Sequence, residues 1–120
     1  MNMVSQAIDS AFVESMAHVQ REIYDNSVEH GFWTGEGNQN IPTKLCLIHS
    51  EVSEALECYR KGNPPSEKCP GHSHLGEELA DTVIRIMDLC EHLGVNLGQA
   101  ILDKHKYNKM RSYQHGGKKC

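Results

Sequence analysis

The chain has 120 residues, of which 38% are apolar and 23% charged, and its formal net charge is −4. This length fits one domain, and the acidic balance argues against a generally basic nucleic-acid binder. No apolar run approaches the roughly 18 residues that a membrane-spanning helix needs. Asp9 and Glu14 interrupt the N-terminal apolar pattern, which is therefore not that of a signal peptide.

The five cysteines are odd in number and widely spaced, and no C-x-x-C motif occurs. Such a set argues against a framework of disulfides, which small secreted domains use in place of a large core. A protein with free thiols belongs in a reducing compartment, so the expected location is cytoplasmic.

The first half of the chain predicts two helices. Apolar residues recur every three or four positions over 4–29, which is the pattern of an amphipathic helix. Glycine and asparagine are frequent over 30–41, which we expect to form a loop. Pro42 suits the first turn of a second helix. That helix should end near Lys61, before the Gly-Asn-Pro-Pro sequence at 62–65.

The second half predicts two further helices. The third should cover about 75–93, with Gly94 as its C-terminal cap. Asn96, followed three residues later by Gln99, resembles a capping box and marks the start of a fourth helix. The fourth helix is expected to reach roughly Tyr113.

These elements predict one helical domain over 1–113 and a flexible basic tail over 114–120. Four helices with three connections, one of them long, are typical of an all-α, antiparallel four-helix bundle. Residues 101–120 carry six Lys and Arg against one acid, whereas 1–100 carry six against fifteen acids. Composition leaves open whether the basic end is solvated or brings positive charge to an acidic centre.

Two of the predicted helices carry paired acids. Glu51 and Glu54 lie three residues apart on the second helix, as do Glu78 and Asp81 on the third, so each pair shares a helix face. Both faces border an apolar stripe, where carboxylates repel one another and lose hydration. A bound Mg²⁺ or Mn²⁺ ion would compensate for this repulsion and lost hydration. Because Mg²⁺ keeps positions open for water and for substrate phosphates, the cluster would then be catalytic. The alternative is ordinary exposed acids paired with Lys or Arg.

The fourth predicted helix carries the opposite charge. Lys104, Asn108 and Arg111 are separated by four and three residues and therefore share a face. Lys and Arg neutralise phosphate oxygens, and the amide of Asn108 can hydrogen-bond a sugar hydroxyl, a phosphate or a base edge. The alternative is a solvated basic face.

Taken together, these motifs resemble one family. The stretches HSEVSEALECYRKG, GEELADTVIRIMDLCEHLGVNLGQAI and KHKYNKMRSYQHGGK fall within residues 44–118. They resemble the MazG-like nucleoside triphosphate pyrophosphohydrolases of the all-α NTP pyrophosphatase group. The resemblance implies a helical bundle, a homodimer or homotetramer, that hydrolyses (d)NTPs to the monophosphate and pyrophosphate. It implies Mg²⁺ as cofactor, and the carboxylate ligands would also suit Mn²⁺ as a substitute.

The resemblance also implies roles for residues at matching positions. The family's metal-binding and catalytic acids fall on Glu51, Glu54, Glu78 and Asp81. Its positions that face the nucleotide fall on Lys104, Asn108 and Arg111. The sequence departs from the family at Ser50, where the first motif often has a leading glutamate, and this departure leaves the number of metal ions open.

Two further residues are candidates for substrate binding. Arg85 follows Asp81 on the acidic face, where it either contacts phosphate or pairs with Asp81 or Asp88. Trp33, in the glycine-rich loop, either stacks on a base or covers the open end of the bundle. The loop over 62–74 is either a lid or a connector, and its cysteine and two histidines lack the second ligand cluster that a structural Zn²⁺ site needs.

The function expected from the sequence is therefore Mg²⁺-dependent hydrolysis of (d)NTPs. The alternatives are a non-catalytic oligomeric helical module and a nucleotide-sensing pseudo-enzyme. A di-iron carboxylate bundle is disfavoured, because such bundles use E-x-x-H pairs and the chain has none. The expected partners are a nucleoside triphosphate and further copies of the chain, with neither a nucleic acid polymer nor a membrane.

Overall fold

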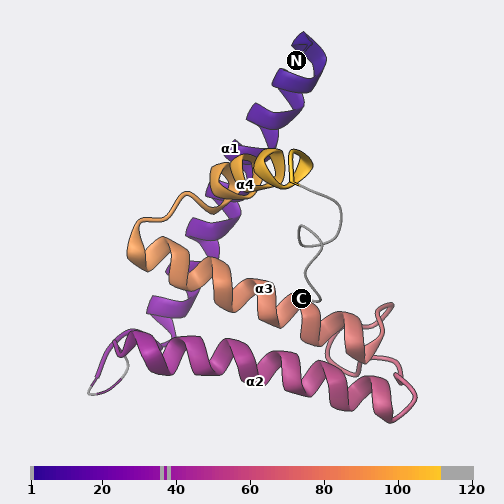
Figure 1. Ribbon diagram of the computed structural model, residues 1–120. Helices are drawn as coiled ribbons and strands as arrows, with labels where there is room; N and C mark the ends of the chain where they lie inside the picture. The colour runs from indigo at the N-terminus through magenta and orange to yellow at the C-terminus, as the bar shows by residue number, and fades with distance from the viewer. Residues whose placement is uncertain (1, 36, 38, 112–120) are drawn as a thin grey trace.

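The computed structural model describes residues 2–35, 37 and 39–111. Within these residues lie four helices and no strand (Figure 1): α1 (Met3–Glu29), α2 (Ile41–Arg60), α3 (His74–Leu93) and α4 (Leu97–Lys109). The predicted all-α bundle is confirmed. Among the described helices, none is long and apolar enough to cross a membrane. The tail predicted over 114–120 lies outside the described residues.

Side-chain caps explain where the helices begin. The side chains of Asn2, Asn40, Ser73 and Asn96 each accept a hydrogen bond from the backbone N–H three residues further on. Each bond satisfies a donor that the first turn of a helix leaves unpaired. Gly94 ends α3 in the left-handed conformation, as predicted.

The fourth helix is shorter than the sequence pattern predicts. It ends with Met110 as its C-cap, whereas the pattern extended it to Tyr113, which lies outside the described residues. Met110 is 80% exposed, so packing does not hold a further turn in place. The capping box is half formed, because the Asn96 side chain caps the helix while the Gln99 side chain donates to Asp103.

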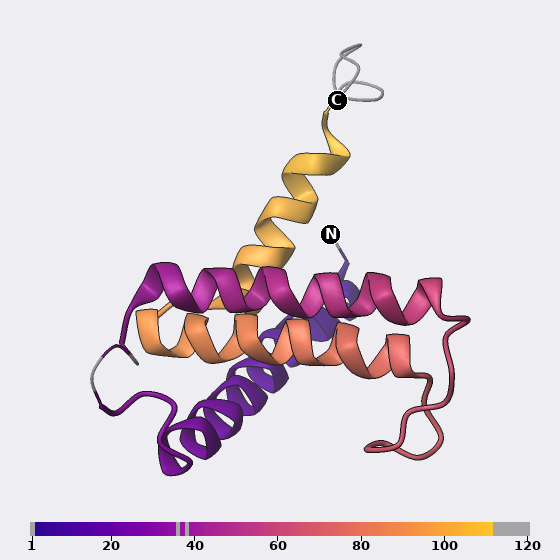
Figure 2. The same cartoon turned by 90° about the horizontal axis from the view of Figure 1, so that it is seen from below.

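Helices α1, α2 and α3 pack together, and α4 lies apart from α2 and α3. α3 returns beside α2 in the opposite direction, and α1 crosses this pair (Figures 1 and 2). Contacts join α2 to α3, α3 to α1, and α1 to α4. The antiparallel arrangement is therefore seen in α2 and α3 alone, whereas α1 crosses this pair and α4 packs on α1 and projects away from it (Figures 1 and 2).

The molecule is open, with a small core. The buried apolar side chains in the described part of the chain are Trp33, Ala55, Cys58, Met87 and Leu89. The radius of gyration is 17.2 Å, whereas a compact domain of this length has a radius of about 14 Å. Most of the apolar burial lies where α2 and α3 pack together, and this packing positions the acidic residues.

Candidate metal centre and adjoining cleft

The acidic faces of α2 and α3 meet where the two helices pack. Glu51 of α2 and Glu78 and Asp81 of α3 each offer a carboxylate oxygen, and these atoms lie within 4.8 Å of one another. Glu54, one turn further along α2, is exposed and lies outside this group. Three of the four predicted metal ligands are therefore brought together, in an arrangement that suits a divalent cation.

Glu78 is buried with one carboxylate oxygen unsatisfied. Only 8% of the residue is exposed, and its Oε2 atom has no hydrogen-bond partner among the described residues. The other oxygen, Oε1, lies 3.2 Å from Nε2 of His74. Burial raises the pKa of Glu78 to about 7, and the carboxylates of Glu51 and Glu54 act in the same direction. A cation at this position would favour the ionised carboxylate.

The pKa values of the other two acids move in opposite directions. Burial acts to raise the pKa of Glu51, but its hydrogen bonds, above all the one from Arg85, outweigh burial and lower that pKa. Burial raises the pKa of Asp81, and the charges of Glu51 and Glu77 add to this effect. The group therefore combines one readily ionised carboxylate with two whose ionisation a cation would assist.

Arg85 joins α3 to α2. Its Nε donates to Oε1 of Glu51 at 2.8 Å. The sequence offered Asp81 and Asp88 on the same helix as ion-pair partners, whereas the acid that Arg85 contacts lies on the neighbouring helix. The Arg85 side chain is 39% exposed and lines the cleft beside the acids, so a ligand in this cleft can reach it.

A cleft of about 740 Å³ lies between α1, α2, α3 and the loop that follows α1. Its charged wall includes Glu51, Asp81, Lys44 and Arg85. Its apolar wall includes Val19, Ile23, Phe32, Leu47, Ile84 and Leu89. This volume is typical of a small-molecule site, and the two walls suit a ligand with both charged and apolar parts.

Trp33 forms a wall of the cleft and is only 4% exposed. Its ring stacks on His92 with 3.9 Å between centroids, and Nζ of Lys44 lies 4.2 Å from the ring centroid. Its Nε1 donates to Asp88 at 2.9 Å, and the Ser27 hydroxyl donates to the other oxygen of that carboxylate at 3.0 Å. These contacts fasten the loop to α1 and α3, so the geometry favours the covering role of Trp33 over base stacking.

Phe32 is an aromatic residue of the cleft that the sequence analysis missed. It is 60% exposed and lines the cleft. Its backbone carbonyl accepts a hydrogen bond of 2.6 Å from Nζ of Lys44, which connects the loop to α2. The aromatic pair at 32–33 was visible in the sequence, but a loop has no periodicity to indicate which ring is buried.

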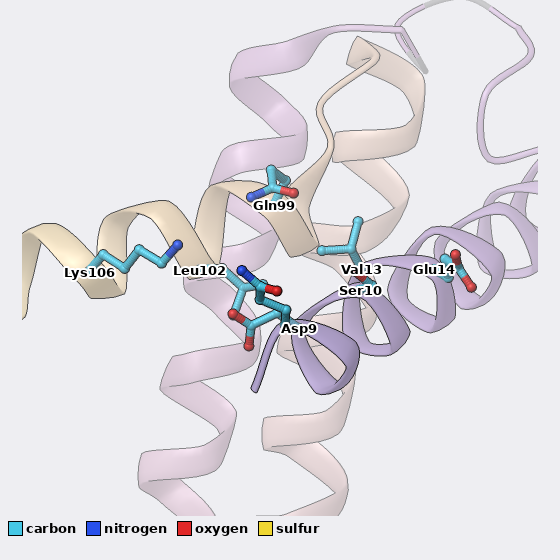
Figure 3. Close-up of a pocket in the computed structure, with 8 residues that line it drawn as sticks. Asp9, Ser10, Val13, Glu14, Gln99, Leu102 and Lys106 are labelled. Carbon is cyan, nitrogen blue, oxygen red and sulfur yellow. The ribbon is translucent and has the colours of Figure 1, made fainter. Parts of the chain in front are cut away.

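The predicted basic residues lie apart from the acids of the same chain. Lys104, Asn108 and Arg111 belong to α4 or the turn after it, and α4 packs on α1 and projects away from α2 and α3 (Figure 2). All three are exposed, and none lines the cleft. α4 instead borders a polar groove against α1, where Asp9 and Lys106 are found (Figure 3). Within one chain, the acids and these basic residues are not brought together.

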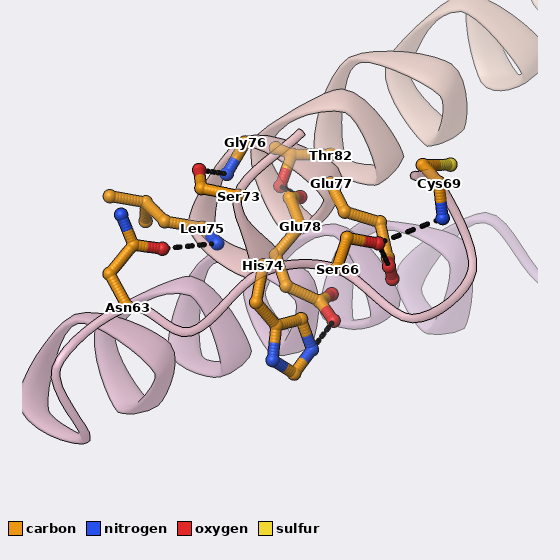
Figure 4. A network of polar contacts seen from close by, with 10 residues as sticks. All are labelled: Asn63, Ser66, Cys69, Ser73, His74, Leu75, Gly76, Glu77, Glu78 and Thr82. Atoms are coloured by element: carbon orange, nitrogen blue, oxygen red, sulfur yellow. Dashed lines mark hydrogen bonds and ion pairs between the residues drawn. The ribbon is translucent and has the colours of Figure 1, made fainter. Parts of the chain in front are cut away.

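A separate polar network holds the loop between α2 and α3 (Figure 4). Glu77 is buried and accepts a hydrogen bond from the Ser66 hydroxyl, whose oxygen accepts one from the Cys69 N–H at 2.9 Å. Glu77 thus fastens the loop to α3, and it lies outside the three-carboxylate group that contains its neighbour Glu78.

Comparisons of this chain with protein-family models, with curated proteins and with solved structures found no significant match. The interpretation of the site therefore rests on its own residues and geometry. The resemblance to MazG-like enzymes stays a prediction from the sequence.

Proposed function

We propose that the protein is a Mg²⁺-dependent nucleoside triphosphate pyrophosphohydrolase. It converts a (d)NTP and water to the nucleoside monophosphate and pyrophosphate, which breaks the phosphoanhydride link between the α- and β-phosphates. The observation that carries the proposal is the convergence of Glu51, Glu78 and Asp81 beside a cleft that also presents two cationic side chains. The resemblance of the motifs to MazG-like pyrophosphohydrolases supports the same function.

Three carboxylates would hold the ion: those of Glu51, Glu78 and Asp81. When bound, Mg²⁺ supplies positive charge to the triphosphate oxygens and makes a coordinated water more acidic. Glu54 lies outside this group but close enough to Glu78 to raise its pKa. We assign Glu54 the role of accepting the proton of the attacking water, because it is exposed and is not needed as a ligand.

The cationic residues of the cleft would bind the phosphates. Arg85 and Lys44 both line the cleft, and Arg85 contacts Glu51 of the acidic group. Burial lowers the pKa of Lys44, while the charge of Asp88 counteracts this effect. Both side chains offer N–H donors to phosphate oxygens and stabilise charge that develops on pyrophosphate as it leaves. The exposed ring of Phe32 and the apolar wall are then available to the base and sugar.

The proposal is tested by measuring pyrophosphate release from canonical and modified NTPs and dNTPs, with and without Mg²⁺. Glu78→Gln should lower Mg²⁺-dependent release by about 100-fold or more, because it removes a ligand charge while keeping the shape of the side chain. Glu57→Gln is the matched control on α2, since Glu57 is exposed and pairs with Lys61. Full turnover by Glu78→Gln contradicts the assignment of the centre.

Thermal melts separate the enzyme from the two alternatives. A ligand that binds only the folded state raises the melting temperature, so Mg²⁺ with a non-hydrolysable nucleotide should stabilise the enzyme. A nucleotide-sensing pseudo-enzyme would be stabilised in the same way but would release no pyrophosphate. A non-catalytic helical module would show neither effect.

A further inference from the structure

A second group of metal-ligating side chains lies next to the three carboxylates. Cys58 of α2 and His74 and Glu78 of α3 each offer one ligand atom, and these atoms lie within 4.8 Å of one another. Glu78 belongs to both groups. Cys58 and His74 do not line the cleft that would hold the phosphates, whereas Glu51 and Asp81 of the first group do.

The spacing of His74 and Glu78 suits a tetrahedral ion. They are four residues apart on α3, and Nε2 of His74 lies 3.2 Å from Oε1 of Glu78 (Figure 4). With metal–nitrogen and metal–oxygen distances of about 2.0–2.1 Å, tetrahedral Zn²⁺ places two such atoms about 3.3–3.4 Å apart. A metal ion could therefore replace this direct contact with little movement of either side chain.

The surroundings of Cys58, His74 and Glu78 favour the binding of a cation. Cys58 is buried, with 6% of the residue exposed, and Glu78 is buried with its Oε2 atom unpartnered. A cation bound here would stabilise the Cys58 thiolate and the Glu78 carboxylate together. The His74 side chain is 41% exposed and gives an ion a route from solvent.

The chemistry of the ligands selects the metal. Thiolate and imidazole are ligands of Zn²⁺, whereas Mg²⁺ prefers oxygen ligands alone. Three protein ligands leave one position of a tetrahedral ion for water. The two groups are therefore chemically distinct although they share a carboxylate.

We propose that Cys58, His74 and Glu78 form a Zn²⁺ site, and that zinc bound there inhibits the magnesium centre by occupying the Glu78 carboxylate that both groups share. The zinc site depends only on its own three ligands. The inhibition rests in addition on the proposed pyrophosphohydrolase function.

Binding is tested with Co²⁺ as a spectroscopic substitute for Zn²⁺ on the full chain. The wild-type protein should develop the near-ultraviolet absorption of a cobalt–thiolate bond, and Zn²⁺ should displace the cobalt. Cys58→Ser should abolish this band and weaken zinc binding by about 100-fold, whereas Cys46→Ser, an exposed cysteine on the same helix, should leave both unchanged. His74→Ala should also weaken binding, and circular dichroism checks that each variant is folded. An unchanged band in Cys58→Ser overturns the site.

Inhibition is tested by titrating Zn²⁺ into the pyrophosphate-release assay at fixed Mg²⁺. Cys58→Ser should need at least about tenfold more zinc for half-inhibition than the wild type and Cys46→Ser need. Equal sensitivity of Cys58→Ser and wild type overturns the inhibitory role. Asp81→Asn separates the two proposals, because it removes a ligand of the magnesium centre alone. A retained cobalt–thiolate band in this variant supports the zinc site even if no substrate is hydrolysed, and its loss contradicts an independent site.

Discussion

At the scale of single residues, the acids of the site are stabilised without a metal in two different ways. Glu51 accepts a hydrogen bond from Arg85 across the helix pair, while burial among other carboxylates raises the pKa of Glu78 to about 7 and so favours its protonated form. The three-residue spacing of the acids predicts which side chains share a face. It does not predict the partner of Arg85, because that partner is set by the register of α2 against α3.

Glu78 should make stability depend on pH in a defined direction. Its pKa rises from 4.5 to about 7 on folding, so its contribution to stability is fully present below the lower value and is lost as the pH rises through the higher one. Mg²⁺ competes with this proton. The increase in melting temperature on adding Mg²⁺ should therefore be larger at about pH 8 than at about pH 5.5.

Melts of the wild type and of Glu78→Gln, with and without Mg²⁺, provide the measurement. The glutamine variant imitates the protonated side chain, so it should gain stability relative to wild type as the pH rises, and it should respond weakly to Mg²⁺ at either pH. An equal Mg²⁺ effect on the wild type at both pH values would show that Glu78 is not titrating at the ion site.

Substitutions of the neighbouring residues Trp33 and Phe32 should have different effects: the first should lower stability, and the second should weaken substrate binding. Trp33→Ala removes a buried ring with a hydrogen bond to Asp88 and should lower the free energy of unfolding by about 3–5 kcal/mol. Phe32→Ala removes an exposed ring and should change stability by less than about 0.5 kcal/mol. In the assay, Phe32→Ala should raise KM about tenfold with little change in kcat. An unchanged KM would exclude stacking of the base on Phe32.

At the scale of the elements, local signals predicted the helices well. The prolines, the capping asparagines and Gly94 act through the backbone next to them, so their effects are visible in the sequence. The predicted end of α4 was wrong, because where this helix ends depends on packing against another helix. The burial of Ser66 and Glu77 could not be predicted either, since both are polar and become buried only when the loop folds over α3.

The contacts of the loop between α2 and α3 predict that Ser66 contributes more to the free energy of unfolding than Ser73, the N-cap of α3, does. Ser66→Ala leaves the buried Glu77 carboxylate without its donor and should lower the free energy of unfolding by about 1–3 kcal/mol. Ser73→Ala removes the N-cap of α3 and should cost about 1 kcal/mol. Ser53→Ala, at an exposed position of α2, is the control. Denaturant unfolding gives all three values, and a smaller loss for Ser66→Ala than for Ser73→Ala would contradict this ranking.

At the scale of the whole molecule, the sequence predicted an all-α bundle but not its open shape. Amphipathic stripes show which face of a helix is apolar and do not show what covers that face. Large apolar side chains on every helix stay exposed, among them Ile8, Leu56, Val83 and Ile101. Together with the radius of gyration of 17.2 Å, this exposure predicts that copies of the chain associate and bury these faces against one another.

Self-association would also explain the position of the basic residues on α4. Lys104 belongs to α4, which packs on α1 and lies apart from the acidic faces of α2 and α3 (Figures 1 and 2), so any contact of Lys104 with a bound triphosphate has to be in the site of another copy. Glu78→Gln and Lys104→Ala should each be nearly inactive alone. When the two variants are mixed after unfolding, or are co-expressed, half of the dimers are mixed and each mixed dimer has one intact site. Pyrophosphate release should then recover to about a quarter of the wild-type rate. A mixture as inactive as its parents would show that Lys104 and Glu78 do not complement each other across copies.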